Sequence, residues 1–354
     1  MKMLRILLIA ALTLALCSAV FAQSGSRIGT AGATQLLIPV GSVGTAMGGS
    51  FLANARGIEA IDWNPAGLSV GAKTAQAMFS RMSYIADMDV NYFAAAGKLG
   101  DFGLLGLSVK WVDVGEIEAT TIDSPEGSGV SINPTIMTLA LTYSRAMTDR
   151  IHFGVNVKPV IEKFGTVSGS TMAFDFGLQY REGNSGIRFG IALKNLGARM
   201  RYDGTALEHN LVTPGQPPDA TAQPLRVRLA PVDLPALLEM GIAYDIKVNG
   251  HMGLNLSGTY LNHNYATDEY RVGAEWALSN LLYVRGGFSL SAALQRPGAN
   301  NTEIDEDTAI TDAKPSFGFG LKRSQGDTDF ALDYAYRPVE FFGNTQWFTL
   351  SLGF

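Results

Sequence analysis

Few residues of this chain are arranged in a pattern that could carry out chemistry. The stretch "VGAKT", residues 70–74, lacks the Gly-Lys-Ser/Thr order of a phosphate-binding loop, and no Gly-x-Ser-x-Gly nucleophile motif occurs. The histidines fall in separate segments without the spacing of a zinc-binding pair; they are His152, His209, His251 and His263. We therefore predict that the protein is not an enzyme and binds no metal or other cofactor.

The densest group of potential metal ligands is the acidic stretch "NNTEIDEDTAITD", residues 300–312. Its carboxylates belong to Glu303, Asp305, Glu306 and Asp307. Carboxylate oxygens are ligands that Ca²⁺ prefers, but their spacing here does not match an EF-hand loop. We favour a solvated acidic loop and leave calcium binding open.

The N-terminus, "MKMLRILLIAALTLALCSAVFA" (residues 1–22), has the three parts of a secretory signal. Lys2 and Arg5 precede an apolar core, and an Ala-x-Ala-like cleavage site ends at Ala22. The core is shorter than the roughly 20 residues that a membrane-spanning helix needs. We expect a cleaved signal peptide, which removes the only cysteine, Cys17, and leaves an exported chain without disulfides.

From about residue 74 onward, apolar and polar residues alternate with the period of a β-strand. In "STMAFDFGLQY", residues 170–180, the apolar side chains share one face, while Asp175 and Gln179 share the other. About fourteen segments show this pattern, and most approach the roughly 9–11 residues of membrane-spanning strands. They lie at about 74–85, 88–99, 102–114, 135–147, 150–163, 169–181, 186–197, 235–246, 250–262, 267–279, 281–293, 314–323, 327–338 and 344–354.

The connections between these segments alternate between tight turns and long loops. Residues 148–149 and 182–186 are tight turns, whereas 115–134, 198–234 and 294–313 are long loops. Short turns at one end and long loops at the other are typical of outer-membrane barrels. The final segment, "WFTLSLGF", ends on an aromatic residue, which resembles the signal that the barrel-assembly machinery of Gram-negative bacteria reads.

A sheet in hydrocarbon has to close on itself, because lipid offers no partners to unpaired backbone groups. We therefore predict an all-β fold: a transmembrane antiparallel β-barrel of about 14 strands, formed by residues 74–354, in the outer membrane of a Gram-negative bacterium. The apolar faces then point toward lipid, and the charged side chains, which have both signs, line a paired and hydrated lumen. By parity the lumen charges include Lys110, Asp175, Arg188, Arg271, Glu275, Arg285 and Asp333.

A barrel of this size has a lumen too wide for its own side chains to fill, because eight strands is about the limit for that. Residues 23–73 precede the first strand, lack a clear period and are rich in small residues. We predict that this segment folds back into the lumen as a plug with one or two short helices. Within it, Pro65 restricts the backbone of Asn64, and we expect Trp63 to pack against the inner wall.

Two short motifs stand out within residues 41–69: Met47, Gly48 and Gly49 and, after a spacer, Trp63, Asn64, Pro65, Ala66, Gly67 and Leu68. Together they resemble the N-terminal signature of the PorV/PorQ family, which belongs to the wider group of FadL-type barrels. In FadL-type proteins the Asn-Pro-Ala step lies in an N-terminal hatch inside a barrel of fourteen strands. The resemblance therefore implies the same barrel and plug for this chain.

The resemblance implies two kinds of function. PorV/PorQ proteins serve type IX secretion, so the implied partners are the type IX translocon and the secreted proteins that it handles. FadL-type barrels take up long-chain fatty acids or other hydrophobic small molecules. We predict the accessory role in secretion and keep hydrophobic transport as the alternative, with membrane lipid around the barrel and no nucleic acid in either case.

The long loop 198–234 and the start of the following strand are unusually apolar for exposed chain. The apolar side chains either cover the barrel mouth, as a surface for a hydrophobic ligand or partner protein, or belong to strands that extend above the membrane. The sequence does not decide between these two arrangements. The candidate surface comprises Leu225, Val227, Leu229, Leu234 and Leu237.

Overall fold

A computed structural model of the protein describes residues 29–71, 73–120, 124–183, 185–211, 223–248, 252–279, 281–291, 312–339 and 343–354. The predicted signal peptide lies outside the described residues, as does the acidic stretch except for Asp312. No helix among the described residues is long and apolar enough to cross a membrane.

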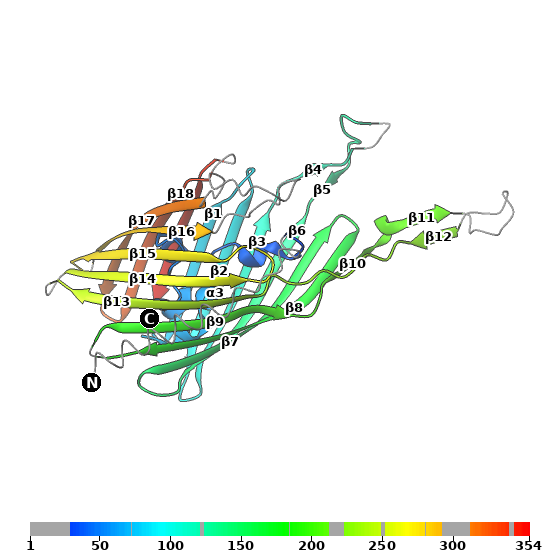
Figure 1. Ribbon diagram of the computed structural model, residues 1–354. Helices are drawn as coiled ribbons and strands as arrows, with labels where there is room; N and C mark the ends of the chain where they lie inside the picture. Colours follow the sequence, from blue (N-terminus) through cyan, green and yellow to red (C-terminus); the bar gives the residue numbers. More distant parts are fainter. Residues whose placement is uncertain are drawn as a thin grey trace, which may run out of the picture.

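Fourteen antiparallel strands of the described chain close into one barrel (Figure 1). Each pairs with the next barrel strand along the chain, and the last pairs with the first, with Gln76 opposite Gly353. The barrel strands are β1 (Ala75–Ser83), β2 (Asp89–Leu99), β3 (Gly103–Asp113), β6 (Thr135–Ala146), β7 (Ile151–Phe164), β8 (Val167–Arg181), β9 (Ile187–Gly197), β13 (Leu237–Lys247), β14 (Met252–His263), β15 (Glu269–Leu278), β16 (Leu282–Ser291), β17 (Asp312–Gln325), β18 (Thr328–Arg337) and β19 (Thr345–Gly353). The predicted fold class is confirmed, and every strand overlaps a segment found by its alternating pattern.

Short strands within the long loops extend the barrel at one end, which we call the loop end (Figure 1). β4 (Ile117–Glu118) pairs with β5 (Ser131–Ile132), and β11 (Glu208–Leu211) pairs with β12 (Gln223–Arg226). β10 (Arg201–Gly204) adds to the end of β8. The tight turns lie at the opposite end, the turn end, so the two ends differ as the sequence predicted.

Alternate side chains of the strands face outward and are apolar. On β8, Phe174, Phe176 and Leu178 are 37%, 41% and 43% exposed. Between them, Asp175 and Gln179 are 1% and 0% exposed and face the lumen. An apolar outer face around a polar interior is the pattern of a barrel surrounded by hydrocarbon.

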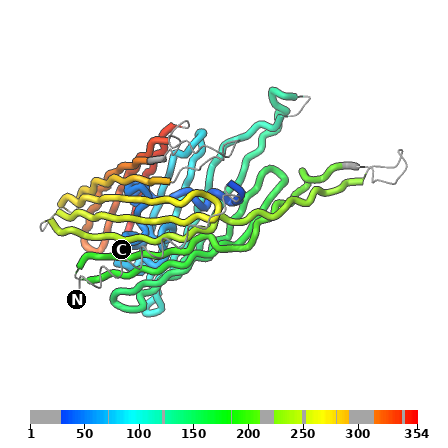
Figure 2. Tube along the Cα trace, in the orientation of Figure 1, coloured from blue at the N-terminus to red at the C-terminus, as the bar shows by residue number. Residues whose placement is uncertain are grey.

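Residues 29–71, which we call the N-terminal segment, run through the lumen (blue in Figure 2). The segment contacts β16 to β19 through α2 and β6 to β8 through η4. The segment therefore joins opposite walls of the barrel. Its helices are short: η2 (Thr34–Leu37), α2 (Ser42–Ala46), η3 (Gly57–Glu59), α3 (Ala60–Trp63) and η4 (Pro65–Ser69).

Inward-facing glycines of the wall let the backbone of this segment come very close to the strands. A Cβ atom at Gly177 would lie 2.2 Å from Oδ1 of Asn64, and one at Gly154 would lie 2.2 Å from the carbonyl carbon of Pro65. Any larger residue would collide, so glycine is required where the two backbones meet. The wall glycines of this kind are Gly154, Gly177, Gly190, Gly273 and Gly287.

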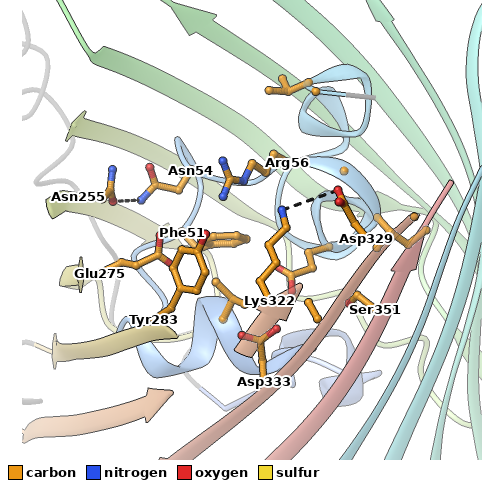
Figure 3. Close-up of a pocket in the computed structure, with 18 of the residues that line it drawn as sticks. Phe51, Asn54, Arg56, Asn255, Glu275, Tyr283, Lys322, Asp329, Asp333 and Ser351 are labelled. Atoms are coloured by element: carbon orange, nitrogen blue, oxygen red, sulfur yellow. Dashed lines mark hydrogen bonds and ion pairs between the residues drawn. The ribbon is translucent and has the colours of Figure 1, made fainter. Parts of the chain in front are cut away.

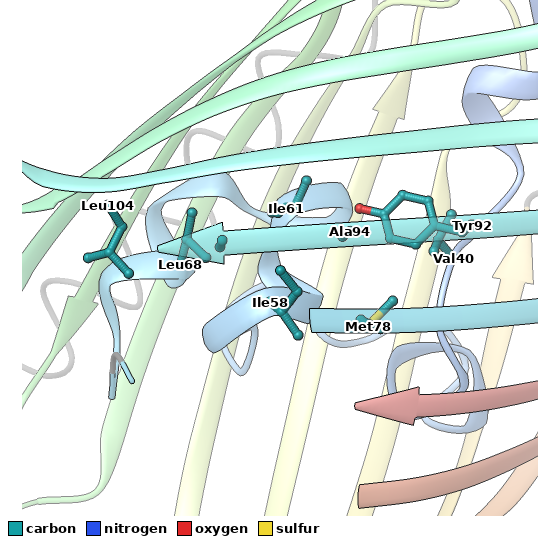
Figure 4. Close-up of a cluster of buried hydrophobic side chains, with 9 residues drawn as sticks. Val40, Ile58, Ile61, Leu68, Met78, Tyr92, Ala94 and Leu104 are labelled. Carbon is teal, nitrogen blue, oxygen red and sulfur yellow. The ribbon is translucent and has the colours of Figure 1, made fainter. Parts of the chain in front are cut away.

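An apolar cluster fixes the second half of the segment to the first three strands (Figure 4). Ile58, Ile61 and Leu68 of the segment are at most 4% exposed. They pack with Tyr92 of β2 and Leu104 of β3. Burial of an aliphatic side chain is worth about 1.5–3 kcal/mol relative to exposure, so this contact is a main source of the segment's stability.

The substitution Gly287→Ala should weaken the packing of the segment. Its Cβ atom would lie 2.2 Å from the carbonyl carbon of Met47 and 2.4 Å from the amide nitrogen of Gly48. Overpacking of this kind costs about 1–3 kcal/mol, so we expect the midpoint of urea unfolding to fall. Gly286→Ala is the matched control, because the nearest contact of its Cβ atom is at 3.9 Å. Equal midpoints for the two variants would contradict the close packing.

Candidate functional site in the lumen

The Asn-Pro step joins the N-terminal segment to the wall. Asn64 is extended, with φ −154° and ψ 103°, as expected before a proline. Its Oδ1 accepts a hydrogen bond from the Ala66 amide at 3.2 Å, and its Nδ2 donates to the Leu178 carbonyl of β8 at 3.2 Å. The side chain is fully buried. Asparagine thus starts η4 and holds it to β8 at the same time.

Trp63 packs mainly inside the segment, and its ring faces the wall through Lys194 of β9, whose Nζ lies 6.0 Å from the ring centroid. Its Nε1 donates to the Val40 carbonyl at 2.8 Å, and its ring meets Phe51 edge-on with centroids 5.9 Å apart. A Cβ atom at Gly44 would lie 2.5 Å from the same ring. The segment therefore has a small core of its own, which keeps it folded without long helices. This core consists of Val43, Met47, Phe51, Ala55, Ala60 and Trp63.

The Met-Gly-Gly turn contacts the wall on the other side of the lumen. Gly48 and Gly49 have φ angles of 67° and 80°, which glycine adopts without steric cost. A Cβ atom at Gly48 would lie 2.6 Å from the Phe288 amide of β16, and one at Gly49 would lie 2.9 Å from the Arg271 side chain of β15. The two sequence motifs are thus two docking points of the segment, on opposite walls.

The predicted lumen charges face inward, and those near the turn end form ion pairs. Arg285 bridges two carboxylates, with Nε 2.6 Å from Glu275 and Nη1 2.5 Å from Asp333. Arg188 pairs with Asp245 across β9 and β13. Arg285 and Arg188 therefore each have an acidic partner on a neighbouring strand.

The remaining predicted charges meet partners that the sequence did not reveal. Lys110 lies 3.5 Å from Asp62 of the N-terminal segment. Asp175 lies 2.6 Å from Lys158 and accepts a hydrogen bond from the Asn195 amide at 2.8 Å. The β8–β9 register shifts at Asp175, so this network holds a bulge in the wall. Farther toward the loop end, Arg271 pairs with Glu269 at 2.7 Å.

A cavity of about 340 Å³ lies between the segment and the wall near the turn end (Figure 3). The segment contributes Arg56 and Glu59 to its lining, and the wall contributes Glu275, Tyr283 and Asp333 among others. Figure 3 shows Arg56, Glu275, Tyr283 and Asp333 around one space. The cavity is therefore polar and charged, although Phe51, Ile58 and other apolar groups line part of it.

Sequence reasoning missed several cavity residues, and the reasons differ. Arg181 alternates with Asp175 and Gln179 along β8, so strand parity does predict that it faces inward. Glu59 has no such signal, because it meets Asp333 only through the fold of the N-terminal segment.

Burial among other carboxylates raises the pKa of Glu59 from its ordinary value of 4.5 to about 8. Loss of solvent is the largest cause, and the negative charge of Asp333 adds to it, while Arg285 and Arg56 oppose it. Glu59 is therefore mainly protonated at neutral pH and loses its proton in mildly basic solution.

An apolar cluster lies on one side of the lumen at the loop end. Leu36 of the segment packs with Val160 of β7 and Leu234, all of them buried. The Gly32 amide donates a hydrogen bond to the Asp233 carbonyl at 2.9 Å. The chain around residue 233 therefore covers the start of the N-terminal segment.

The structure divides the predicted apolar surface into two groups. Leu225 and Val227 are 42% and 49% exposed on the projecting hairpin, whereas Leu234 and Leu237 are 4% and 6% exposed at the mouth. Leu229 is half-buried between the two groups. Leu225 and Val227 thus extend beyond the barrel, which is one of the two arrangements considered for this loop. Leu234 and Leu237 lie within the barrel mouth, which is the other.

Comparison with solved structures identifies channels of the same architecture. The CymD monoaromatic hydrocarbon channel is 14% identical, covers 89% of this chain and 97% of its own, and has a TM-score of 0.52. The Pseudomonas putida toluene transporter TodX is 14% identical, with coverages of 88% and 96% and a TM-score of 0.52. A Pseudomonas aeruginosa FadL homologue is 15% identical, with coverages of 89% and 98% and a TM-score of 0.50.

These likenesses show the fold, which is that of FadL-type outer-membrane channels. No family model matches the chain, and no curated protein does. The PorV/PorQ assignment is therefore not confirmed and stays a prediction from residues 41–69.

The raised pKa of Glu59 predicts that docking of the N-terminal segment weakens as the pH rises. The protonated form is favoured in the docked state, so its stabilisation is complete below about pH 4.5 and is lost as the pH rises through about 8. We expect the ion conductance of single channels to increase across this range, and Glu59→Gln to flatten the increase. Glu116→Gln, on an exposed loop, is the control. A Glu59→Gln profile that matches the wild-type profile would refute this role.

Proposed function

We propose that the protein is an outer-membrane channel for small hydrophobic molecules, with the N-terminal segment as its gate. The observation that carries the proposal is the apolar contact at the loop end, where Leu36 and Leu234 belong to one buried cluster inside a barrel with an apolar outer face. A hydrophobic molecule can replace such a contact at little cost, because it offers the same apolar surface to both sides. A polar solute would have to lose its hydration there.

The fold likeness supports this proposal. The names of CymD and TodX describe a monoaromatic hydrocarbon channel and a toluene transporter, and they cover 89% and 88% of this chain. Uptake of hydrophobic molecules is also what the resemblance to FadL-type barrels implies. The predicted signal peptide and the orientation of the loops fit a protein whose loop end faces outward and whose turn end faces the periplasm.

Passage then requires rearrangement of the segment in two places. The contact of residues 29–36 with residues 232–236 has to open at the loop end. The docking of the two motifs has to loosen next, because their backbones lie directly against wall glycines such as Gly177 and Gly287. The turn-end cavity beyond them then leads toward the periplasm.

The accessory role in type IX secretion receives no comparable support. It rests on the resemblance of residues 41–69, and in this chain those residues dock the segment to the wall. Docking is a structural task that a hydrophobic channel needs equally. We therefore prefer the transport alternative over the secretion role that the sequence favoured.

A disulfide that ties the segment to its cover should block passage. A Cβ atom at Gly32 would lie 3.3 Å from Cβ of Val232, close to the roughly 3.5–4.5 Å of natural disulfides. We expect the oxidised Gly32→Cys/Val232→Cys variant to lose uptake of labelled toluene into cells, and dithiothreitol to restore it. The two single-cysteine variants are the controls. Unchanged toluene uptake by the oxidised double variant would contradict the proposed gate.

A further inference from the structure

Three arginines gather at one side of the turn-end cavity. Arg56 comes from the N-terminal segment, Arg181 from the end of β8 and Arg188 from the start of β9. Each lines the same cavity, and their positive charges act on one another. Like charges that lie close together repel one another and destabilise the fold. A cleft lined by one sign of charge also attracts ions of the opposite sign.

Charge pairing elsewhere in the cavity leaves these arginines in excess. Six cationic and five acidic residues line the cavity. Arg285 forms ion pairs with both Glu275 and Asp333. Asp329 lies between two lysines, 3.4 Å from Lys73 and 4.0 Å from Lys322.

Two acidic residues remain for the three arginines, Glu59 and Asp245. Because its pKa is raised to about 8, Glu59 carries little charge at neutral pH. Asp245 pairs with Arg188 and also accepts a hydrogen bond from Asn255 at 2.7 Å. The cluster therefore has a positive charge that the protein does not neutralise.

Several hydrogen-bond donors of the three arginines also lack partners. Arg188 is 6% exposed, yet its Nε has no hydrogen-bond partner among the described residues, and neither has the buried Nη1 of Arg181. Arg56 makes no hydrogen bond or ion pair within the described part of the chain. A buried donor without a partner is costly, and a charged one more so.

We propose that Arg56, Arg181 and Arg188 form a binding subsite for the carboxylate of a small amphipathic molecule. A carboxylate matches the fork of guanidinium donors and supplies the missing negative charge. Phe51, Ile58 and Tyr283 line the same cavity and offer surface to an apolar body. A volume of about 340 Å³ is at the lower end of the range for small-molecule sites, which suits an aromatic or short-chain acid.

The subsite deepens the proposed function and rests on it only for the route by which the acid arrives. The named channels CymD and TodX concern hydrocarbons, which carry no charge, whereas this cluster distinguishes an acid from a neutral molecule of the same shape. Its position at the turn end places it last on the inward route, where a charged head group meets water again.

Isothermal titration of benzoate into the full mature barrel in nonionic detergent tests the subsite, with benzamide as a neutral molecule of the same shape. We expect benzoate to bind at one site and benzamide to bind at least roughly tenfold more weakly. Arg56→Gln and Arg181→Gln should each weaken benzoate binding roughly tenfold or more, since a hydrogen bond to a charged group is lost. Arg56 is exposed, so its variant keeps the test valid if Arg181→Gln fails to fold.

Arg150→Gln is the matched control, because Arg150 is exposed at the same end of the barrel and does not line the cavity. Absence of benzoate binding, equal binding of benzamide, or an equal loss in Arg150→Gln overturns the subsite. The wild-type barrel is also tested for toluene passage. Benzoate binding without toluene passage supports the subsite and overturns the channel, while passage without benzoate binding overturns the subsite alone.

Discussion

Hydrocarbon offers no hydrogen bonds to a polypeptide backbone, and the rest of this structure depends on that constraint. A sheet that faces lipid has to pair every edge, so β19 returns to β1 and the barrel closes. Fourteen strands then enclose a lumen that their own side chains cannot fill. The chain meets this second requirement with its first described residues, which fold back inside.

The way in which residues 29–71 fill the lumen explains their composition. The segment is built on a core around Trp63 and on turns at Gly48, Gly49 and Asn64. Wall positions that face it are glycines wherever two backbones touch, as at Gly154 and Gly287. Backbone therefore packs directly on backbone in the middle of the lumen.

The two ends of the lumen have different chemistry. At the loop end, Leu36 and Leu234 close an apolar contact. At the turn end, the charges of Arg285, Glu275 and Asp333 surround a polar cavity. An apolar contact at one end and a polar cavity at the other suit the proposed passage of a molecule from lipid-like surroundings into water.

The sequence predicted the barrel well because strand parity is a local property. Alternation along β8 correctly placed Phe176 outside and Asp175 inside. It could not place Trp63, whose partners Val40 and Phe51 depend on the fold of an irregular segment. The same reason hid the meeting of Glu59 with Asp333 in the cavity.

The predicted apolar loop surface shows a further limit of the sequence. Leu225 and Leu234 are equally apolar, yet Leu225 is exposed and Leu234 is buried. That difference is set by where the chain leaves the projecting hairpin and crosses back to the N-terminal segment, and hydropathy does not report it.

Hydrogen exchange of the backbone amides in residues 42–69, measured on the barrel in a lipid bilayer, tests the central claim most directly. If the segment fills the lumen and is the part that moves, these amides are strongly protected without ligand. Toluene should then speed their exchange while the barrel strands stay protected. Rapid exchange without ligand would contradict the packing, and exchange that toluene leaves unchanged would contradict the gate.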